Sequence, residues 1–159
     1  MNRQANNEVL QKINLFKQKC DEEPELAKAR KILKTILINC ISLYVLLIII
    51  NLIFTGFDIM TIITSLVSLL VLSLFCVGIM NGVKILAILP LIGCIRSLFS
   101  IIVSIFPVNN LNIGYIIYAI SFGVINIILL SLYLYILFST RIKKYETVFK
   151  AITQTKYTF

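Results

Sequence analysis

Residues 35–57 read TILINCISLYVLLIIINLIFTGF, a run of 23 residues without a charged side chain. At about 1.5 Å per residue, a helix of this length crosses a hydrocarbon core about 30 Å thick. Further apolar runs follow, so we predict membrane spans at about 35–57, 59–83, 85–106 and 111–138. The expected fold is an all-α integral membrane protein, a four-span helical bundle.

The composition of the whole chain agrees with this assignment. Of 159 residues, 59% are hydrophobic and 14% charged, and the mean hydropathy is +0.97. Ordinary soluble domains are about half apolar and about a quarter charged. A water-soluble core of this size cannot hide so much apolar surface, so lipid must cover it. The breaks between the spans carry turn-forming residues, namely Gly56, Asp58, Asn81, Gly82, Pro107, Asn109 and Asn110.

Residues 1–34 form a polar head before the transmembrane domain of residues 35–138. Within the head, Val9, Ile13, Phe16 and Cys20 share one face of a helix, which predicts a short amphipathic helix. We expect it to end near Asp21. A second helix should begin at Pro24 and continue into the membrane, because proline and acidic residues favour a helix start.

Residues 139–159 form a basic tail. Its apolar residues recur at helical spacing, which predicts a second amphipathic helix that either extends the fourth span or lies on the membrane surface. The residues on this face are Ile142, Tyr145, Phe149 and Ile152.

The distribution of Lys and Arg predicts the orientation. Eight precede the first span, one lies in the second connection, five follow the fourth span, and the first and third connections have none. The positive-inside rule then places both termini in the cytoplasm, with a bacterial cytoplasmic membrane as the expected location. The net charge of +8 favours anionic lipid head groups as partners, and no nucleic-acid-binding motif accompanies it.

The chain is poor in catalytic side chains. It has no His, and five of its seven carboxylates precede residue 26. Because the spans lack a carboxylate pair or an activated nucleophile, we expect a non-enzymatic protein without a cofactor or a metal. Cysteine spacing agrees, since Cys40, Cys76 and Cys94 lie singly within spans and are expected to be reduced core residues.

Arg96 is the most informative residue. It lies 12 positions after Lys84 and 11 before Pro107, roughly 17 Å from either end of its helix. An Arg at this depth costs about 2.5 to 3.5 kcal/mol, so we expect it to face protein or water. It is either an anion, substrate or gating site, or a structural contact to carbonyls, polar side chains or the acid of a partner subunit.

Other polar residues lie at comparable depth. Asn126 of the fourth span is the expected neighbour of Arg96. It either belongs to a ligand-binding site or forms a hydrogen bond between helices. Serine stripes on the second and third spans either pack together by close approach, which we prefer, or line a wet cavity that leads to Arg96. The stripes contain Thr61, Ser65 and Ser68 on the second span, and Ser97, Ser100 and Ser104 on the third. Gly78 and Gly82 form a weak helix-contact motif.

These observations leave three functional hypotheses. The first is a non-enzymatic membrane subunit that acts in a homo-oligomer or a larger membrane complex. The second is a small channel or transporter, in which Arg96, Asn126, Ser97 and Ser100 line a path for an anion or a polar solute, with the path between protomers because four helices alone enclose little water. The third is a permeabilising or immunity-type membrane factor, which fits the size and charge equally well.

Overall fold

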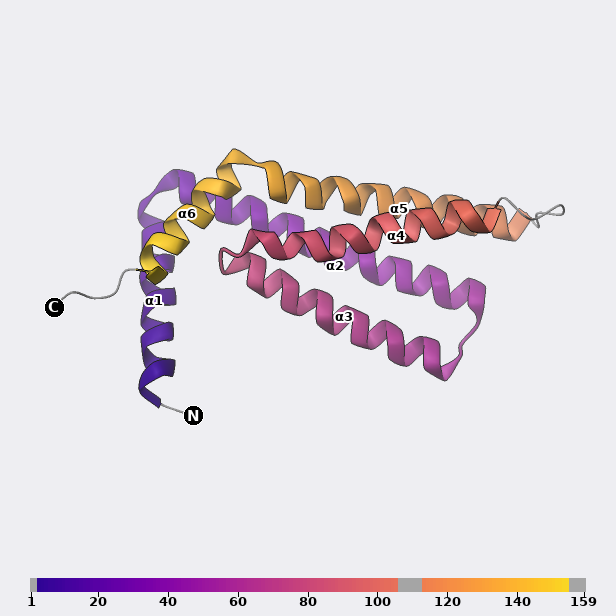
Figure 1. The fold of residues 1–159 in the computed structure, drawn as a ribbon, viewed down its shortest axis with the longest axis horizontal. Coiled ribbons are helices and arrows are strands. Elements are labelled where there is room, and N and C mark those ends of the chain that lie inside the picture. The colour runs from indigo at the N-terminus through magenta and orange to yellow at the C-terminus, as the bar shows by residue number, and fades with distance from the viewer. Residues whose placement is uncertain (1–2, 106–112, 155–159) are drawn as a thin grey trace.

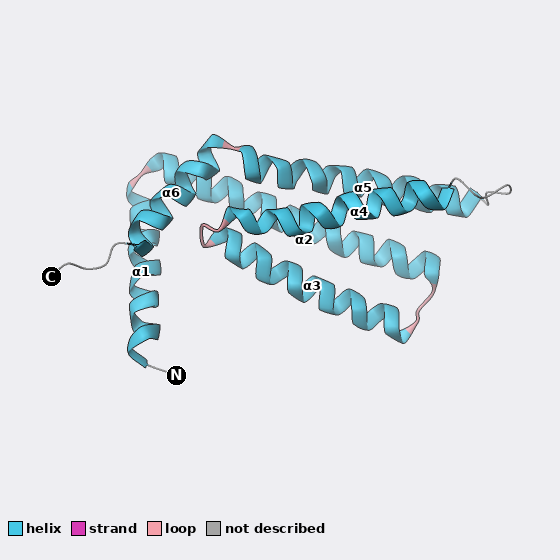
Figure 2. Cartoon of the chain, in the orientation of Figure 1, coloured by secondary structure: helices cyan, strands magenta, loops and turns pink. Residues whose placement is uncertain are grey.

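The computed structural model describes residues 3–105 and 113–154, and every regular element in these residues is a helix (Figures 1 and 2). The elements are α1 (Arg3–Glu22), α2 (Pro24–Thr55), α3 (Ile59–Met80), the short 3-10 helix η1 (Lys84–Ala87), α4 (Ile88–Ile105), α5 (Ile113–Phe138) and α6 (Thr140–Gln154).

The prediction of four membrane spans is confirmed. Helices α2, α3, α5 and the continuous η1 and α4 are each long and apolar enough to cross a bilayer, so the chain is a polytopic membrane protein. The second span is three residues shorter than predicted, because α3 ends at Met80 and Gly82 then adopts a φ of 82°. The expected turn at Pro107, Asn109 and Asn110 lies outside the described residues.

The helix ends follow the local sequence signals. Helix α1 ends at Glu22 and α2 begins at Pro24, as the acidic residues and the proline predicted. Asp58 caps α3, because its carboxylate accepts a hydrogen bond from the backbone N–H of Thr61 at 3.3 Å. Gly56 joins α2 to this cap with a φ of 87°, a conformation that favours glycine.

The bundle has two unlike ends. Helices α1 and α6 lie together at one end, which we call the terminal end, and residues 56–58 join α2 and α3 at the other, the loop end (Figure 1). Helices α4 and α5 pack along their length, whereas α3 diverges from α4 beyond the turn that joins them. The bundle is therefore tight at the terminal end and spread toward the loop end.

A compact unit forms the terminal end, and we call it the terminal cap. It comprises α1, α6, residues 24–33 of α2 and residues 80–87 at the turn between α3 and α4. The Phe16 ring packs edge to face against Tyr145 at 4.9 Å and against Phe149 at 5.0 Å between ring centroids. Around these rings, the fully buried residues are Cys20, Leu26, Leu33, Ala87 and Ile142.

Polar contacts join the turn at residues 80–87 to the end of α5 and to α6. The Tyr145 hydroxyl donates to the Met80 carbonyl at 2.8 Å, and Lys84 Nζ donates to the Leu137 carbonyl at 3.2 Å. The buried Glu146 carboxylate lies 3.6 Å from Lys84 Nζ and 2.9 Å from Lys150 Nζ. These contacts fix the start of the third span relative to the C-terminal helix.

The apolar faces of the two terminal helices contact protein. In α1, Phe16 and Cys20 are buried, and in α6, Ile142 and Tyr145 are each 2% exposed. Helix α6 also turns away from α5 at Ser139 and packs against α1 and α2 (Figure 1). The predicted amphipathic tail helix is confirmed, and it does not continue the fourth span as one straight helix. Its placement on the membrane surface stays a prediction. The two amphipathic faces cover one another in part.

Burial in the terminal cap disfavours the ionised forms of Tyr145 and Cys20. Burial raises the pKa of the Tyr145 hydroxyl to about 12, with a smaller contribution from Cys20 and an opposing one from Arg30. Burial likewise raises the pKa of the Cys20 thiol, although Arg30 acts against it. Both groups are therefore neutral at physiological pH.

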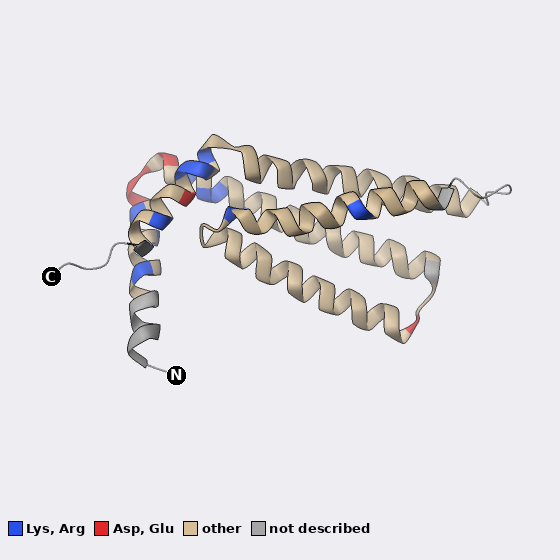
Figure 3. Cartoon of the chain, in the orientation of Figure 1, with Lys and Arg blue, Asp and Glu red and all other residues tan. Residues whose placement is uncertain are grey.

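Charged side chains gather at the terminal end (Figure 3). Over the described residues, the loop end carries Asp58, and α4 carries Arg96 in its middle, as its sequence requires. The apolar middle of the bundle is thus interrupted by one basic side chain.

Candidate site: an intramembrane cavity

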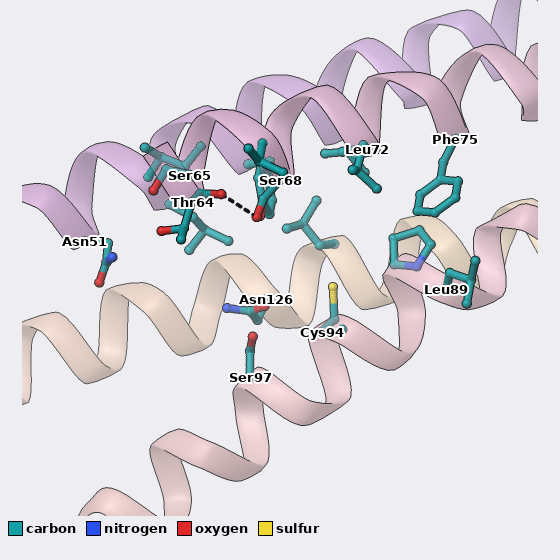
Figure 4. A pocket seen from close by; sticks show the side chains of 18 of the residues that line it. Asn51, Thr64, Ser65, Ser68, Leu72, Phe75, Leu89, Cys94, Ser97 and Asn126 are labelled. Carbon is teal, nitrogen blue, oxygen red and sulfur yellow. Dashed lines mark hydrogen bonds between the residues drawn. The ribbon is translucent and has the colours of Figure 1, made fainter. Parts of the chain in front are cut away.

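A cavity of about 500 Å³ lies among the four spanning helices, on the side where α3 leaves α4 (Figure 4). Its volume is in the range of small-molecule sites, about 300–1,000 Å³. The lining residues are Tyr44, Leu47, Ile48 and Asn51 of α2, Thr64, Ser65, Val67, Ser68, Val71, Leu72 and Phe75 of α3, Leu89, Pro90, Gly93, Cys94 and Ser97 of α4, and Phe122, Asn126, Leu129 and Tyr133 of α5.

Four of the predicted site residues line this cavity. Asn126 and Ser97 come from the adjacent helices α5 and α4, and Figure 4 shows the Ser97 side chain pointing toward Asn126. Ser65 and Ser68 lie on the opposite wall, formed by α3. Asn126 is the deepest polar group of the four, because it is 2% exposed.

Arg96 and Ser100 do not line the cavity. Both are exposed on the outer surface of α4, which faces away from the chain's own interior. Within one chain Asn126 therefore does not neighbour Arg96, and the predicted path that both line between protomers stays a prediction. Arg96 lies about 200° around α4 from the buried cavity residue Cys94, and about 60° from the exposed cavity residue Gly93.

The serine stripes of α3 and α4 do not pack against each other. Ser65 and Ser97 face the cavity from separate walls, whereas Ser68 donates to its own helix, at the Thr64 carbonyl, at 2.8 Å. The preferred prediction of close helix packing is wrong because α3 stays apart from α4 here. Thr61 contacts Asp58 at the loop end, and the Ser104 side chain lies outside the described residues.

The glycines of the weak motif contact parts of the same chain. A side chain at Gly78 would overlap Leu86 of η1, and one at Gly82 would overlap Phe149 of α6. These glycines therefore serve the close approach of the turn and the terminal cap, as small residues do in membrane proteins.

Sequence reasoning missed the contribution of the first span to the cavity. Tyr44, Leu47, Ile48 and Asn51 lie on one face of α2, at helical spacing, and the polar pair at its ends was the available signal. Asn51 is held in place, since its amide oxygen accepts a hydrogen bond from the Tyr118 hydroxyl at 3.2 Å.

The cysteines behave as core residues. Cys20, Cys40, Cys76 and Cys94 are all buried and unpaired as disulfides. Over the described residues, no cluster of three or more His, Cys, Asp or Glu side chains has the arrangement of a metal site. Cys94 lines the cavity as a small apolar side chain.

Comparison with known proteins gives no relative for this chain: no family model, no curated protein and no solved structure matches it.

Proposed function

We propose that this polytopic membrane protein is a non-enzymatic subunit of a membrane complex, and that it binds its partner through the surface around Arg96. This surface, the Arg96 face, consists of exposed residues of α4, namely Ile92, Arg96, Phe99, Ser100 and Val103. The single observation that carries the proposal is the position of an Arg on the outer surface of a spanning helix.

The energetics favour a covering partner. Among the described residues, Arg96 has no hydrogen bond or ion pair, and its depth leaves it in hydrocarbon if only lipid surrounds it. Such exposure costs about 2.5 to 3.5 kcal/mol, which a protein partner with acceptor groups removes. Phe99 beside it is 67% exposed and provides an apolar anchor.

The charge of Arg96 favours a different chain over a second copy. Between Thr35 and Phe138 the sequence contains one carboxylate, Asp58, which lies at the loop end. A second copy therefore supplies only neutral acceptors at the depth of Arg96. A distinct membrane protein with an Asp or Glu inside a span matches the charge fully.

The orientation belongs to the same proposal. The basic terminal end lies in the cytoplasm, where positive connections are retained, and its exposed Lys side chains contact anionic head groups. Partner contacts then occur in the membrane plane and on the cytoplasmic side.

Affinity purification in mild detergent after crosslinking in the membrane tests the proposal. We expect a stoichiometric partner chain that Arg96→Leu loses, while Arg141→Leu, an exposed Arg of α6, retains it. A Ser100→Cys variant distinguishes a second copy, because oxidation then gives a disulfide-linked dimer of this chain. If the full-length protein is crosslinked in the membrane and is recovered only as a monomer, the proposal is contradicted.

The channel alternative places the conducting path between chains. Within one chain Asn126 and Ser97 line the cavity and Arg96 does not, which is consistent with such a path. Anion flux in liposomes that hold the purified protein alone, abolished by Arg96→Leu, supports that form and contradicts the subunit proposal.

A further inference from the structure

The amide of Asn126 has a defined orientation in the cavity. Its Nδ2 donates to the Phe122 carbonyl at 2.9 Å, and a carbonyl only accepts, so the amide oxygen must point the other way. Among the described residues, every fully buried polar side-chain atom has a hydrogen-bond partner. Asn126 Oδ1 accepts no hydrogen bond from these residues, so it is not one of the fully buried atoms. The oxygen therefore opens onto the cavity, although the residue as a whole is 2% exposed.

The rest of the lining defines what can meet this acceptor. The described lining contains no Asp, Glu, Lys or Arg, and most of it is apolar. A charged molecule would find no counter-ion there, and its desolvation would be costly. An apolar molecule with one hydroxyl or N–H group would bury its body against the walls and donate to Asn126.

The cavity opens sideways toward the lipid. Its rim consists of exposed residues on the two diverging helices, including Val67 of α3 and Leu89 of α4, which are 57% and 53% exposed. A molecule dissolved in the bilayer therefore reaches Asn126 between α3 and α4 without crossing water (Figure 4). Gly93 lies at the same rim, and no atom lies within 4 Å of where its Cβ would be.

We propose that the cavity is a binding site for a neutral lipophilic molecule with a hydroxyl or N–H donor, which enters from the bilayer and donates to Asn126 Oδ1. Ser97 stands next to this bond and offers a second hydrogen-bonding group. The inference does not rest on the Arg96 face, because Arg96 lies outside the cavity.

Photolabelling in liposomes tests the site. The probe is a ten-carbon alcohol with a diazirine on its alkyl chain, and the matched control is the same alkane without the hydroxyl. We expect the alcohol to label cavity-lining peptides of α3 and α4 saturably, with competition by unlabelled 1-decanol. The alkane should label the same peptides with about fivefold weaker apparent affinity, since it lacks one hydrogen bond.

Matched variants separate binding from folding. Asn126→Leu should reduce labelling by the alcohol to the level of the alkane, whereas Asn39→Leu, which removes an exposed amide from α2, should leave it unchanged. Gly93→Leu should block labelling by both probes. Gly123→Leu is its control, because Gly123 also has open space around its Cβ and does not line the cavity.

Three results would overturn the inference. The first is equal labelling by the alcohol and the alkane in the wild-type protein. The second is labelling that 1-decanol does not compete. The third is crosslinking of a partner helix to the cavity residues, which would make the cavity a protein interface. Elution of each variant at the wild-type position in size-exclusion chromatography establishes that it is folded, and Gly93→Leu provides the test if Asn126→Leu fails this criterion.

Discussion

The terminal cap and the loop end of the bundle solve the burial of apolar side chains differently. In the cap, the side chains of Phe16, Tyr145 and Ile142 are packed among other side chains and are almost completely buried. Toward the loop end, α3 stands away from α4, and residues such as Ile63 and Leu66 are at least half exposed. The loop end has the more apolar sequence and the looser packing. The terminal cap has a mixed sequence and the tighter packing.

The surrounding solvent explains this difference. Helices that project into water gain free energy only by covering their apolar faces with other parts of the chain. A helix inside a bilayer gains little in this way, because lipid tails are as apolar as Leu. Open packing between α3 and α4 is therefore tolerated in the membrane.

The largest expected effect comes from two glycines with similar φ, one in each region. Gly82→Ala combines backbone strain with overlap of Phe149, whose own Cβ would lie 2.7 Å from the new methyl, and we expect a loss of about 4 kcal/mol. Gly56→Ala has strain alone, because nothing lies within 4 Å, and should cost about 2 kcal/mol. Unfolding in mixed micelles, followed by circular dichroism, measures both; equal losses would contradict the comparison.

A second test compares a buried with an exposed ion pair in the cap. Glu146→Ala removes the carboxylate that lies 3.6 Å from the partly buried Lys84, and should cost about 2 kcal/mol. Asp21→Ala breaks a pair in which the Asp side chain is 76% exposed, and should change stability by less than about 0.5 kcal/mol. The same unfolding assay applies. A neutral Glu146→Ala variant would show that the cap does not depend on this contact.

Alkaline pH should weaken the cap before it affects the spans. Because the pKa of Tyr145 rises from 10 to about 12 on folding, its neutral form stabilises the fold fully below pH 10. That stability declines by about 1.4 kcal/mol per pH unit between 10 and 12. Stability measured at pH 9 and pH 11 should differ less in Tyr145→Phe than in the wild type; the same difference in both would exclude this hydroxyl as the cause.

The smallest effect concerns two tyrosine hydroxyls. Tyr145→Phe deprives the Met80 carbonyl of a 2.8 Å hydrogen bond and should cost about 1 kcal/mol at neutral pH. Tyr118→Phe removes the 3.2 Å bond to Asn51 inside the membrane and should cost about 0.6 kcal/mol. If Tyr118→Phe costs more stability than Tyr145→Phe, the loop end contributes more to the stability of the bundle than its packing indicates.

Sequence patterns predicted the elements well and their faces poorly. Charge-free runs located the spans, and Pro24 and Asp58 located helix starts, because these signals depend on local chemistry and on the thickness of the bilayer. The outward position of Arg96 had no such signal. In an almost wholly apolar helix, the side toward protein and the side toward lipid have similar composition, so periodicity does not distinguish them.

The candidate site shows the same division. Polar residues at similar depth predicted one site for Asn126, Ser97 and Ser65, and these three residues line the same cavity. Their arrangement around a cavity, rather than in a packed seam, depends on the tilt of α3 away from α4. The tilt begins at the turn at residues 80–87, which contacts α5 and α6 through hydrogen bonds between residues more than 50 positions apart.

Helix α3 is fixed to α6 at its Met80 end, whereas the three-residue loop at 56–58 joins its other end to α2. Its Met80 end is fixed by Tyr145, and the helix extends 22 residues from there, or about 33 Å. A rotation of about 5° at that pivot displaces the Asp58 end by roughly 3 Å. Small rearrangements among the aromatic rings of α1 and α6 would thus be magnified at the far side of the bilayer, and would widen or narrow the gap between α3 and α4.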